Sequence, residues 1–298
     1  MQTSSVLRLR KKTQFLPQVK IIILVIDGDF FEVMGCKMAK ACQLFSGSKG
    51  NSIYISSACG KFLVDAGVSA KRLDEKLRSI GVEPDELDGI FVTHEHTDHI
   101  GGLRVFSAKH NLPVFAHKDV AEKIKASGSI KDGVPLYKID ENMEIGGAEI
   151  EPFVNSHDSV ACVGYRFNMN GRSIAVCTDT GYVTDDAREK LKGTDMVYLE
   201  SNHEVTMLEN GFYPYQLKQR ILSAKGHLSN FACGEFAKEL VQNGTTRLVL
   251  AHLSKENNNP DVARQATLCA LSEAGFEQNK DFRLGVSAEE CFERPIVL

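Results

Sequence analysis

Hydrophobic and polar positions along residues 39–298 follow two different periods. Short apolar or alternating runs bounded by Gly, Asn, Asp or Ser are typical of strands, and apolar residues at helical spacing are typical of amphipathic helices. The predicted strands are residues 41–45, 52–56, 61–64, 89–92, 113–116, 148–154, 163–169, 172–177, 196–199 and 247–251. The predicted helices are residues 70–80, 103–110, 120–126, 184–191, 215–224, 230–241 and 262–271. Residues 131–147 have only short apolar pieces and are predicted to form a loop.

No repeat or linker interrupts this alternation, so the pattern predicts one layered α/β domain over residues 39–298. Residues 1–38 differ from it: five Lys and Arg precede the apolar run 21–26, which superficially suggests a signal peptide. The run is too short for one and is followed by Asp27-Gly28-Asp29. We interpret residues 1–38 as an N-terminal extension, either disordered or the product of a start site assigned too far upstream.

Composition and charge narrow the function only slightly. The net charge is −4, so no global field attracts nucleic acid, and a polyanionic substrate needs a local basic patch. The eight cysteines are scattered without a C-x-x-C pair, which favours buried, reduced core thiols and a cytoplasmic location. No apolar run approaches the roughly 18–20 residues of a membrane span, and the sequence leaves the oligomeric state open.

The strongest chemical signal is the segment 93–102, with the sequence THEHTDHIGG, directly after the predicted strand 89–92. In an extended segment the side chains of His94, His96 and Asp98 lie on one face, and His99 joins them as the chain turns. Imidazole and carboxylate together suit Zn²⁺, and the oxygen ligands also admit Mn²⁺ or Fe. The spacing therefore predicts a metal site.

Further His and acidic residues follow other predicted strands. His157 follows strand 148–154, Asp179 follows 172–177, and His252 follows 247–251. Because each candidate ligand stands at a strand end, we expect these strand ends to meet at one cleft. Asp65 follows strand 61–64 and is a candidate to accept a hydrogen bond from a metal-binding histidine.

The H-x-H-x-D-H pattern resembles the signature of the metallo-β-lactamase superfamily of metal-dependent hydrolases. This resemblance implies a four-layer αββα sandwich of two mixed β-sheets flanked by helices, with two divalent ions in the cleft. It assigns His94, His96 and His157 to the first ion, and Asp98, His99 and His252 to the second ion. Asp179 would bridge the ions, Asp65 would support a ligand, and Asp98 would also orient the nucleophile. Zinc, manganese or iron lowers the pKa of bound water from 15.7 to about 7, which yields a metal-bound hydroxide.

The C-terminal third resembles the tRNA 3′-processing (RNase Z) branch, in which a histidine that binds no metal precedes a helix. His227 matches it and would stabilise phosphate charge or protonate the leaving oxygen, with Glu200 as its orienting partner. His203, in the segment 200–203 that replaces the branch's acidic motif, is expected to lie beside the ligands without binding an ion. The motifs 46–52, 200–203, 226–230 and 251–258 together resemble the bacterial YycJ/WalJ group, regarded as metal-dependent exonucleases acting on DNA.

Two departures bear on the substrate. The chain has no room for the long RNA-gripping arm of the endonuclease branch, and the segment between Asp179 and His252 is too short for the inserted domain of the β-CASP nucleases.

The turn 46–51 is open to two interpretations: a simple hairpin connection, or a loop in which Ser46, Ser48, Lys49 and Asn51 hold a phosphate.

Three functions compete at this stage. The leading hypothesis is a dinuclear phosphodiesterase, an exonuclease that cuts DNA from an end. The alternative is a hydrolase of a small thioester or lactone, which the acidic charge favours because such substrates need no basic groove. A redox role with iron and O₂ or NO ranks last, because a partner flavin domain is missing.

Overall fold

The structure, a computed structural model of the 298-residue chain, describes residues 22–26, 29–33, 38–290 and 294–298. The chain divides into two compact units, Met1–Gly35 and Cys36–Leu298. In the first unit, β1 (Ile22–Ile26) pairs antiparallel with β2 (Asp29–Val33). Most of the predicted extension 1–38 lies outside the described residues, so its interpretation stays a prediction.

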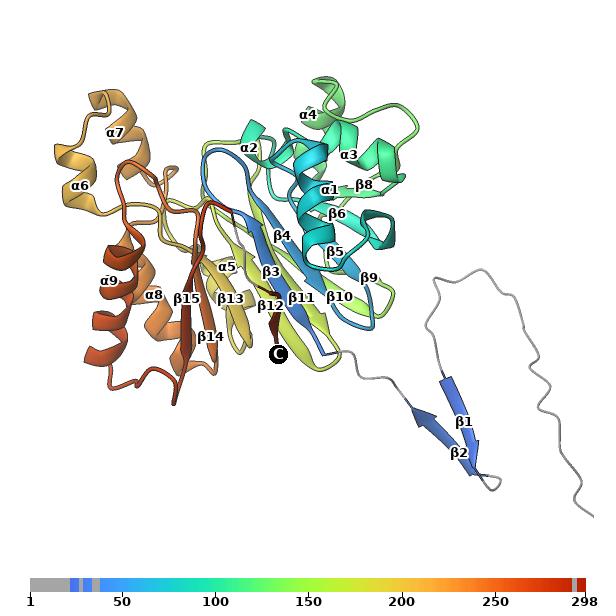
Figure 1. The fold of residues 1–298 in the computed structure, drawn as a ribbon. Helices are drawn as coiled ribbons and strands as arrows, with labels where there is room; N and C mark the ends of the chain where they lie inside the picture. Colours follow the sequence, from blue (N-terminus) through green and yellow to red (C-terminus); the bar gives the residue numbers. More distant parts are fainter. Residues whose placement is uncertain (1–21, 27–28, 34–37, 291–293) are drawn as a thin grey trace, which may run out of the picture. The chain divides into compact units, whose positions relative to one another are not determined.

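Two mixed β-sheets form the centre of the second unit (Figure 1). The first sheet has the strand order β16 (Ile296–Val297), β3 (Lys40–Phe45), β4 (Ser52–Ser56), β5 (Lys61–Val64), β6 (Gly89–Val92), β7 (Val114–Ala116) and β8 (Leu136–Lys138). The second sheet has the order β15 (Arg283–Val286), β14 (Arg247–Ala251), β13 (Met196–Glu200), β12 (Arg172–Cys177), β11 (Val163–Met169), β10 (Ala148–Val154) and β9 (Met143–Ile145).

Each sheet has an antiparallel part and a parallel part. In the first sheet β16, β3, β4 and β5 pair antiparallel, and β5 to β8 run parallel. In the second sheet β9 to β12 pair antiparallel, and β12 to β15 run parallel. The inner parallel strands β6, β7, β13 and β14 are buried on both faces, which explains why they read as continuous apolar runs.

Three hydrophobic clusters define four layers. One cluster packs the first sheet against α1 (Ala70–Ser79), α3 (Leu103–His110) and α4 (Lys118–Ala126). A second packs the other sheet against α5 (Asp185–Leu191), α8 (Asn230–Gln242) and α9 (Pro260–Glu273). The third fills the space between the sheets. The predicted αββα sandwich is confirmed.

Aromatic side chains join the two sheets close to the end of β6. The ring of Phe91 lies 5.3 Å from Tyr165 and 5.2 Å from Phe167 on β11, both in edge contact. The Tyr165 hydroxyl donates a hydrogen bond of 2.8 Å to the carbonyl of Val92, the last residue of β6. This contact holds the segment that carries His94 against the second sheet.

Several local features differ from the sequence predictions. The short edge strands β8 and β9 lie in residues 131–147, where a loop was expected. The short helices η1 (Pro84–Glu86), α2 (Thr97–Ile100) and α6 (Val205–Asn210) were not predicted, and α7 (Tyr215–Leu222) is shorter than expected. Cys269 is exposed, so the prediction of buried thiols is wrong there. Among the described residues no helix is long and apolar enough to span a bilayer.

Candidate metal centre

The strands that carry the candidate ligands end at the same edge of the sandwich. β10, β12, β13 and β14 run in one direction in the second sheet, and β5 and β6 run in parallel in the first. The carboxyl ends of parallel strands meet at one edge of a sheet, where crevices for ligands form. The loops after these six strands bring together the side chains described below.

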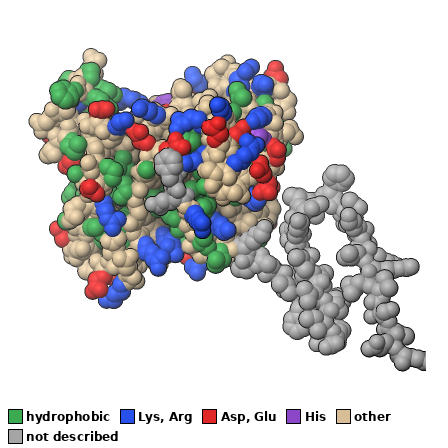
Figure 2. Space-filling model, viewed as in Figure 1, with side chains coloured by type: hydrophobic (Ala, Val, Ile, Leu, Met, Phe, Trp, Pro, Cys, Tyr) green, Lys and Arg blue, Asp and Glu red, His purple; other side chains and the backbone are tan. Residues whose placement is uncertain are grey.

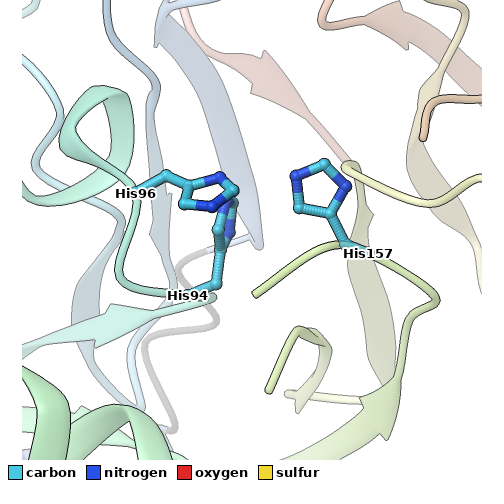
Figure 3. Close-up of side chains that lie close together, drawn as sticks. All are labelled: His94, His96 and His157. Carbon is cyan, nitrogen blue, oxygen red and sulfur yellow. The ribbon is translucent and has the colours of Figure 1, made fainter. Parts of the chain in front are cut away.

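The first cluster contains His94, His96 and His157, whose nearest ring nitrogens all lie within 4.8 Å of one another. Figure 3 shows the three rings converging from two segments of the chain. The ring centroids are 4.6 Å apart for His94–His96 and 5.1 Å apart for both pairs with His157. The Nδ1 of His157 donates to the carbonyl of Gly226 at 3.0 Å, which leaves its Nε2 for a ligand.

The second cluster contains Asp98, His99 and His252. The Oδ2 of Asp98 lies 3.5 Å from the Nε2 of His99 and 3.9 Å from the Nε2 of His252. The expectation of one extended segment through Asp98 is wrong, because the extended backbone ends at His96, which caps α2, and Asp98 lies in the first turn of that helix. The helical turn carries Asp98 and His99 away from His96 and toward His252.

Asp179 lies between the two clusters. Its Oδ2 is 3.4 Å from the Nε2 of His99, and its Oδ1 is 3.4 Å from the Nδ1 of His252. It also groups with His94 of the first cluster within 4.8 Å. Among the carboxylates of the described residues, Asp179 is therefore the one that groups with ligand atoms of both clusters.

Three buried atoms in these clusters have no hydrogen-bond partner among the described residues: the Nε2 of His94, the Nε2 of His252 and the Oδ2 of Asp179. Buried polar atoms in folded proteins are almost always paired, so atoms without a protein partner point to a bound group. Imidazole nitrogens and carboxylate oxygens are the donors that Zn²⁺ and similar cations take. The residues present fit divalent cations.

The electrostatics of the pocket also favour positive charge. Burial lowers the pKa of His94 well below its ordinary range, so this ring presents a neutral nitrogen. Burial alone would lower the pKa of His252 as well, but Asp179, Asp98 and Glu200 raise it to about 10. Asp179 and Asp65 likewise raise the pKa of His99 against the effect of burial. The carboxylates that surround these histidines therefore give the pocket a negative field, which attracts cations.

Asp65 and Thr93 support the ligand loop from behind. Asp65 accepts hydrogen bonds from His99 Nδ1 at 2.7 Å, from the Thr93 backbone at 2.8 Å and from the Thr93 hydroxyl at 2.9 Å. The Thr93 hydroxyl also lies 3.0 Å from the Nδ1 of His94. These contacts fix the tautomer and orientation of the rings so that each Nε2 faces the pocket.

Glu200 supports the other side and is fully buried. Its Oε1 accepts from the Nδ1 atoms of His227 and His252, both at 2.8 Å, and its Oε2 accepts from the backbone N–H groups of Thr180 at 2.9 Å and Leu228 at 3.1 Å. Burial would raise the pKa of Glu200, but His227 and His252 hold it below its ordinary value. With four donors already on its two oxygens, Glu200 orients histidines rather than offering a lone pair to an ion.

Three residues at the strand ends have left-handed backbones although they are not glycine: Asp65 at φ 64°, Asp179 at φ 62° and His252 at φ 56°. Asp and His tolerate this region better than most residues, but it still costs on the order of 1 kcal/mol or more. The abrupt turn after each strand aims the side chain into the pocket. Such strain persists where the surrounding structure demands it.

The turn between β3 and β4 packs against the same loops. The Ser46 hydroxyl accepts from the backbone N–H of His252 at 2.9 Å. The Asn51 amide lies 3.0 Å from His99 Nε2 and 3.3 Å from Asp98 Oδ2. Ser48 and Lys49 are exposed at the edge of a small pocket of about 120 Å³. Ser46 and Asn51 therefore brace the ligands, and the phosphate-binding role expected of Ser46, Ser48, Lys49 and Asn51 stays a prediction.

His203 lies close enough to Glu200 and His227 for their charges to act on it. Its backbone pairs with Ser229, and its two buried ring nitrogens have no hydrogen-bond partner among the described residues. Burial lowers its pKa to about 4. Its expected supporting role beside the ligands stays a prediction.

Sequence reasoning missed three contributors. Thr93 stands directly before the His motif, a position that alone could have drawn attention to it. Gly226 offers its carbonyl to His157, and a Cβ there would lie 2.1 Å from the carbonyl oxygen of Ile221, so only glycine fits. Arg220 forms a two-pronged ion pair with Asp158, the neighbour of His157. Nothing in the local sequence around Gly226 or Arg220 signals these contacts, which span more than 60 residues.

Comparison with known proteins agrees with this fold. Residues 61–253 match the Beta-lactamase superfamily domain, a range that runs from β5 to the residue after His252. The chain therefore belongs to the metallo-β-lactamase superfamily.

Within that superfamily the chain is similar to named bacterial nucleases. It is 38% identical over 245 residues to exodeoxyribonuclease WalJ of Streptococcus pneumoniae, covering 81% of this chain and 91% of that protein. It is 37% identical over 243 residues to exodeoxyribonuclease YycJ of Bacillus anthracis, covering 81% and 92%. The fold also matches the crystal structure of the metallo-β-lactamase fold protein YhfI of Bacillus subtilis, with a TM-score of 0.63, 21% identity and coverage of 85% and 98%.

Proposed function

We propose that this protein is a dinuclear metal-dependent phosphodiesterase that removes nucleotides from an end of DNA. One observation carries the proposal: Asp179 groups with His94 and His99 and also with His252, His227 and Glu200, so one carboxylate joins both clusters and reaches His227, which Glu200 orients. The similarity to two named exodeoxyribonucleases over more than nine-tenths of their length supports DNA as the substrate.

His94, His96 and His157 would hold one ion, Asp98, His99 and His252 the other, and Asp179 would lie between them. Zn²⁺ and Mn²⁺ suit this set of nitrogen and oxygen donors, and Fe is compatible with it. When bound, a pair of such ions supplies an activated water at neutral pH and neutralises charge on the phosphate. Asp65 and Glu200 keep the histidine rings aimed at the ions, which sustains metal affinity.

His227 is suited to act on the phosphate. Its ring centroid lies 4.9 Å from that of His157 and 5.2 Å from that of His252, so it stands at the rim of both clusters. Its Nδ1 donates to Glu200, which leaves Nε2 as the ring nitrogen that faces a substrate. From there it would donate to the phosphate oxygen that gains charge, or protonate the leaving oxygen. Asp98, near both histidines of the second cluster, would orient the nucleophilic water.

Exposed Ser48 and Lys49 would contact a phosphate of the same strand. Their pocket also contains Arg72 and Lys255, although Glu290 and Glu289 pair with these two cations. Lys49 has no ion-pair partner among the described residues, and it is the cation of this pocket left for a substrate.

The test is a nuclease assay with purified protein, Mn²⁺ or Zn²⁺, and end-labelled DNA. We expect wild-type protein to shorten the labelled DNA and the Asp98→Ala variant to lose this activity. His227→Ala should retain metal, measured by elemental analysis, yet cleave at least 100-fold more slowly. Asp119→Ala, at an exposed position on α4, is the matched control and should behave as wild type.

The same preparation should be tested on chromogenic thioesters and lactones. Hydrolysis of these esters with intact DNA would reject the proposal and favour the small-molecule hydrolase. Equal activity of wild-type and Asp98→Ala protein on DNA would show that the cleavage comes from a contaminant.

A further inference from the structure

The helical hairpin of α6 and α7, residues 205–222, carries exposed aromatic rings that the described fold does not use. Of the large hydrophobic side chains exposed in the described residues, five are aromatic, and four of these lie in residues 182–231: Tyr182, Phe212, Tyr215 and Phe231. Phe212 is 107% exposed and Tyr215 is 75% exposed. Figure 2 shows hydrophobic side chains gathered at this outer corner of the molecule, where Figure 1 places α6 and α7.

The hairpin is held in place by polar contacts, so its rings are presented by a built element. Lys218 on α7 donates to the backbone carbonyl of Glu209 on α6 at 2.8 Å. The backbone N–H of Glu204 donates to Asn257 at 2.9 Å at the start of the hairpin. At Gly211 a Cβ would lie 2.7 Å from the Asn257 side chain, so the turn packs closely there.

The base of the hairpin reaches the metal centre directly. Arg220 near the end of α7 pairs with Asp158, and Ser156 donates to the carbonyl of Ala224 at 2.8 Å. His157, a candidate ligand, donates to Gly226 in the same segment. α7 has eight residues, so it is about 12 Å long, the length of three to four stacked nucleotides.

The charge of this segment differs from that of the chain. Residues 205–225 contain Lys218, Arg220 and Lys225 against the single acid Glu209, and Lys218 and Lys225 remain as cations once Arg220 pairs with Asp158, whereas the whole chain has a net charge of −4. Exposed aromatic faces next to cations, leading to a nuclease centre, are the combination by which proteins hold single strands without reading their sequence. A membrane surface or an acidic peptide would not explain why the hairpin is anchored on the loop of His157.

We propose that the α6–α7 hairpin is a base-stacking platform for a single DNA strand, with Phe212 and Tyr215 holding the nucleotides that lie outside the cleft. This inference rests on the proposed nuclease function and adds the form of the substrate: a strand that is unpaired for several nucleotides beyond the cleaved bond.

The first test compares wild-type protein with the Phe212→Ala/Tyr215→Ala double variant. We expect the KM for a twelve-nucleotide oligothymidylate to rise about tenfold or more, because each lost ring removes a stacked base. Hydrolysis of bis(p-nitrophenyl) phosphate, which is too small to reach the hairpin, should stay unchanged. Tyr137→Ala is the matched control: Tyr137 is an exposed aromatic residue on β8 of the other sheet, and its removal should leave both substrates unaffected.

A second test is independent of cleavage. The chain contains no tryptophan, so Phe212→Trp introduces a single tryptophan at the platform. With a phosphorothioate oligonucleotide, which resists cleavage by the metal-loaded protein, the tryptophan fluorescence of this variant should be quenched by the single strand and much less by a blunt duplex. An unchanged KM in the double variant, or no quenching by the single strand, would overturn the inference. So would a loss of self-association in the double variant without a change in KM, since the rings would then bind a second copy of the chain.

The two proposals fail in different ways. Wild-type protein that leaves all DNA intact would reject the nuclease, and the fluorescence titration alone would then decide whether the hairpin binds a single strand. If wild-type protein degrades DNA and the double variant has the same KM, the nuclease proposal stands and the platform proposal is rejected.

Discussion

Replacing Glu200 by Gln tests whether one buried carboxylate organises both halves of the site. The two side chains have the same shape, but Gln has one oxygen where Glu200 has two. All four groups that face Glu200 are donors: two histidine Nδ1 atoms on one oxygen and two backbone N–H groups on the other. Whichever way the amide is oriented, its NH₂ group faces two donors and both bonds on that side are lost.

The backbone N–H groups of Thr180 and Leu228 cannot change their protonation, so the amide oxygen should face them and the NH₂ group should face His227 and His252. Hydrogen bonds to a charged partner contribute about 1.5–3 kcal/mol each, which puts the total loss at roughly 3–6 kcal/mol. Part of this loss lowers the free energy of unfolding, and part releases the two rings from their orientation. Loss of such a supporting partner weakens metal affinity or activity by about 10–100-fold per ligand. Because His227 is affected together with His252, we expect kcat/KM to fall about 100-fold or more.

The assay is hydrolysis of bis(p-nitrophenyl) phosphate at saturating Mn²⁺, combined with Mn²⁺ titration and thermal unfolding of the same samples. Glu204→Gln is the matched control, since within the described residues Asn230, at 3.4 Å, is the one hydrogen-bond partner of its carboxylate, and it should stay within twofold of wild type. Thermal unfolding separates a folded, inactive variant from an unfolded one. A folded Glu200→Gln protein with wild-type metal affinity and kcat/KM would refute the reasoning.

Three further outcomes follow from the structure. Gly67→Ala places a Cβ 1.7 Å from the Asp98 carbonyl oxygen. In a urea titration this variant should lower the free energy of unfolding by about 1–3 kcal/mol or more. The control is Gly285→Ala, whose added carbon meets atoms no closer than 3.7 Å and which should have little effect. Addition of EDTA to Mn²⁺-loaded protein should lower Tm by about 5–10 °C in a thermal scan, because a ligand present at 100 times its Kd stabilises the folded state by about 2.7 kcal/mol. An unchanged Tm would argue against metal binding. Burial opposes ionisation of Asp74, but the hydrogen bonds from Lys109 and His110 hold the pKa of this carboxyl below its ordinary value. The ionised carboxylate therefore stabilises the fold fully above about pH 5, and this stabilisation is lost as the pH falls below about 4. Wild-type protein should therefore be more stable than Asp74→Asn at pH 7, and a difference that persists undiminished at pH 3 would contradict this.

Much of the architecture was readable from local pattern. Buried parallel strands such as β6 and β14 are continuous apolar runs, and helices such as α8 show clear helical spacing with Ser229 as an N-cap. Pattern failed where elements are short and lie at the edge. β8 and β9 have three residues each with little buried surface, and α6 buries only Leu208. These segments therefore need no regular alternation of apolar and polar residues, and the sequence gives no pattern that predicts them.

For the site, the sequence alone supplied the candidate residues, because metal chemistry requires particular side chains and they stand at recognisable strand ends. It could not show which atoms meet. The sharing of Glu200 between His227 and His252, the support of His99 by Asp65, and the position of Asp179 between both clusters depend on contacts across 27 to 80 residues. Only the packing of the two sheets, with their parallel strands ending at one edge, brings these segments within hydrogen-bonding distance. The exposure of Phe212 and Tyr215 was likewise decided by tertiary structure, since an aromatic pair in a sequence reads equally well as core.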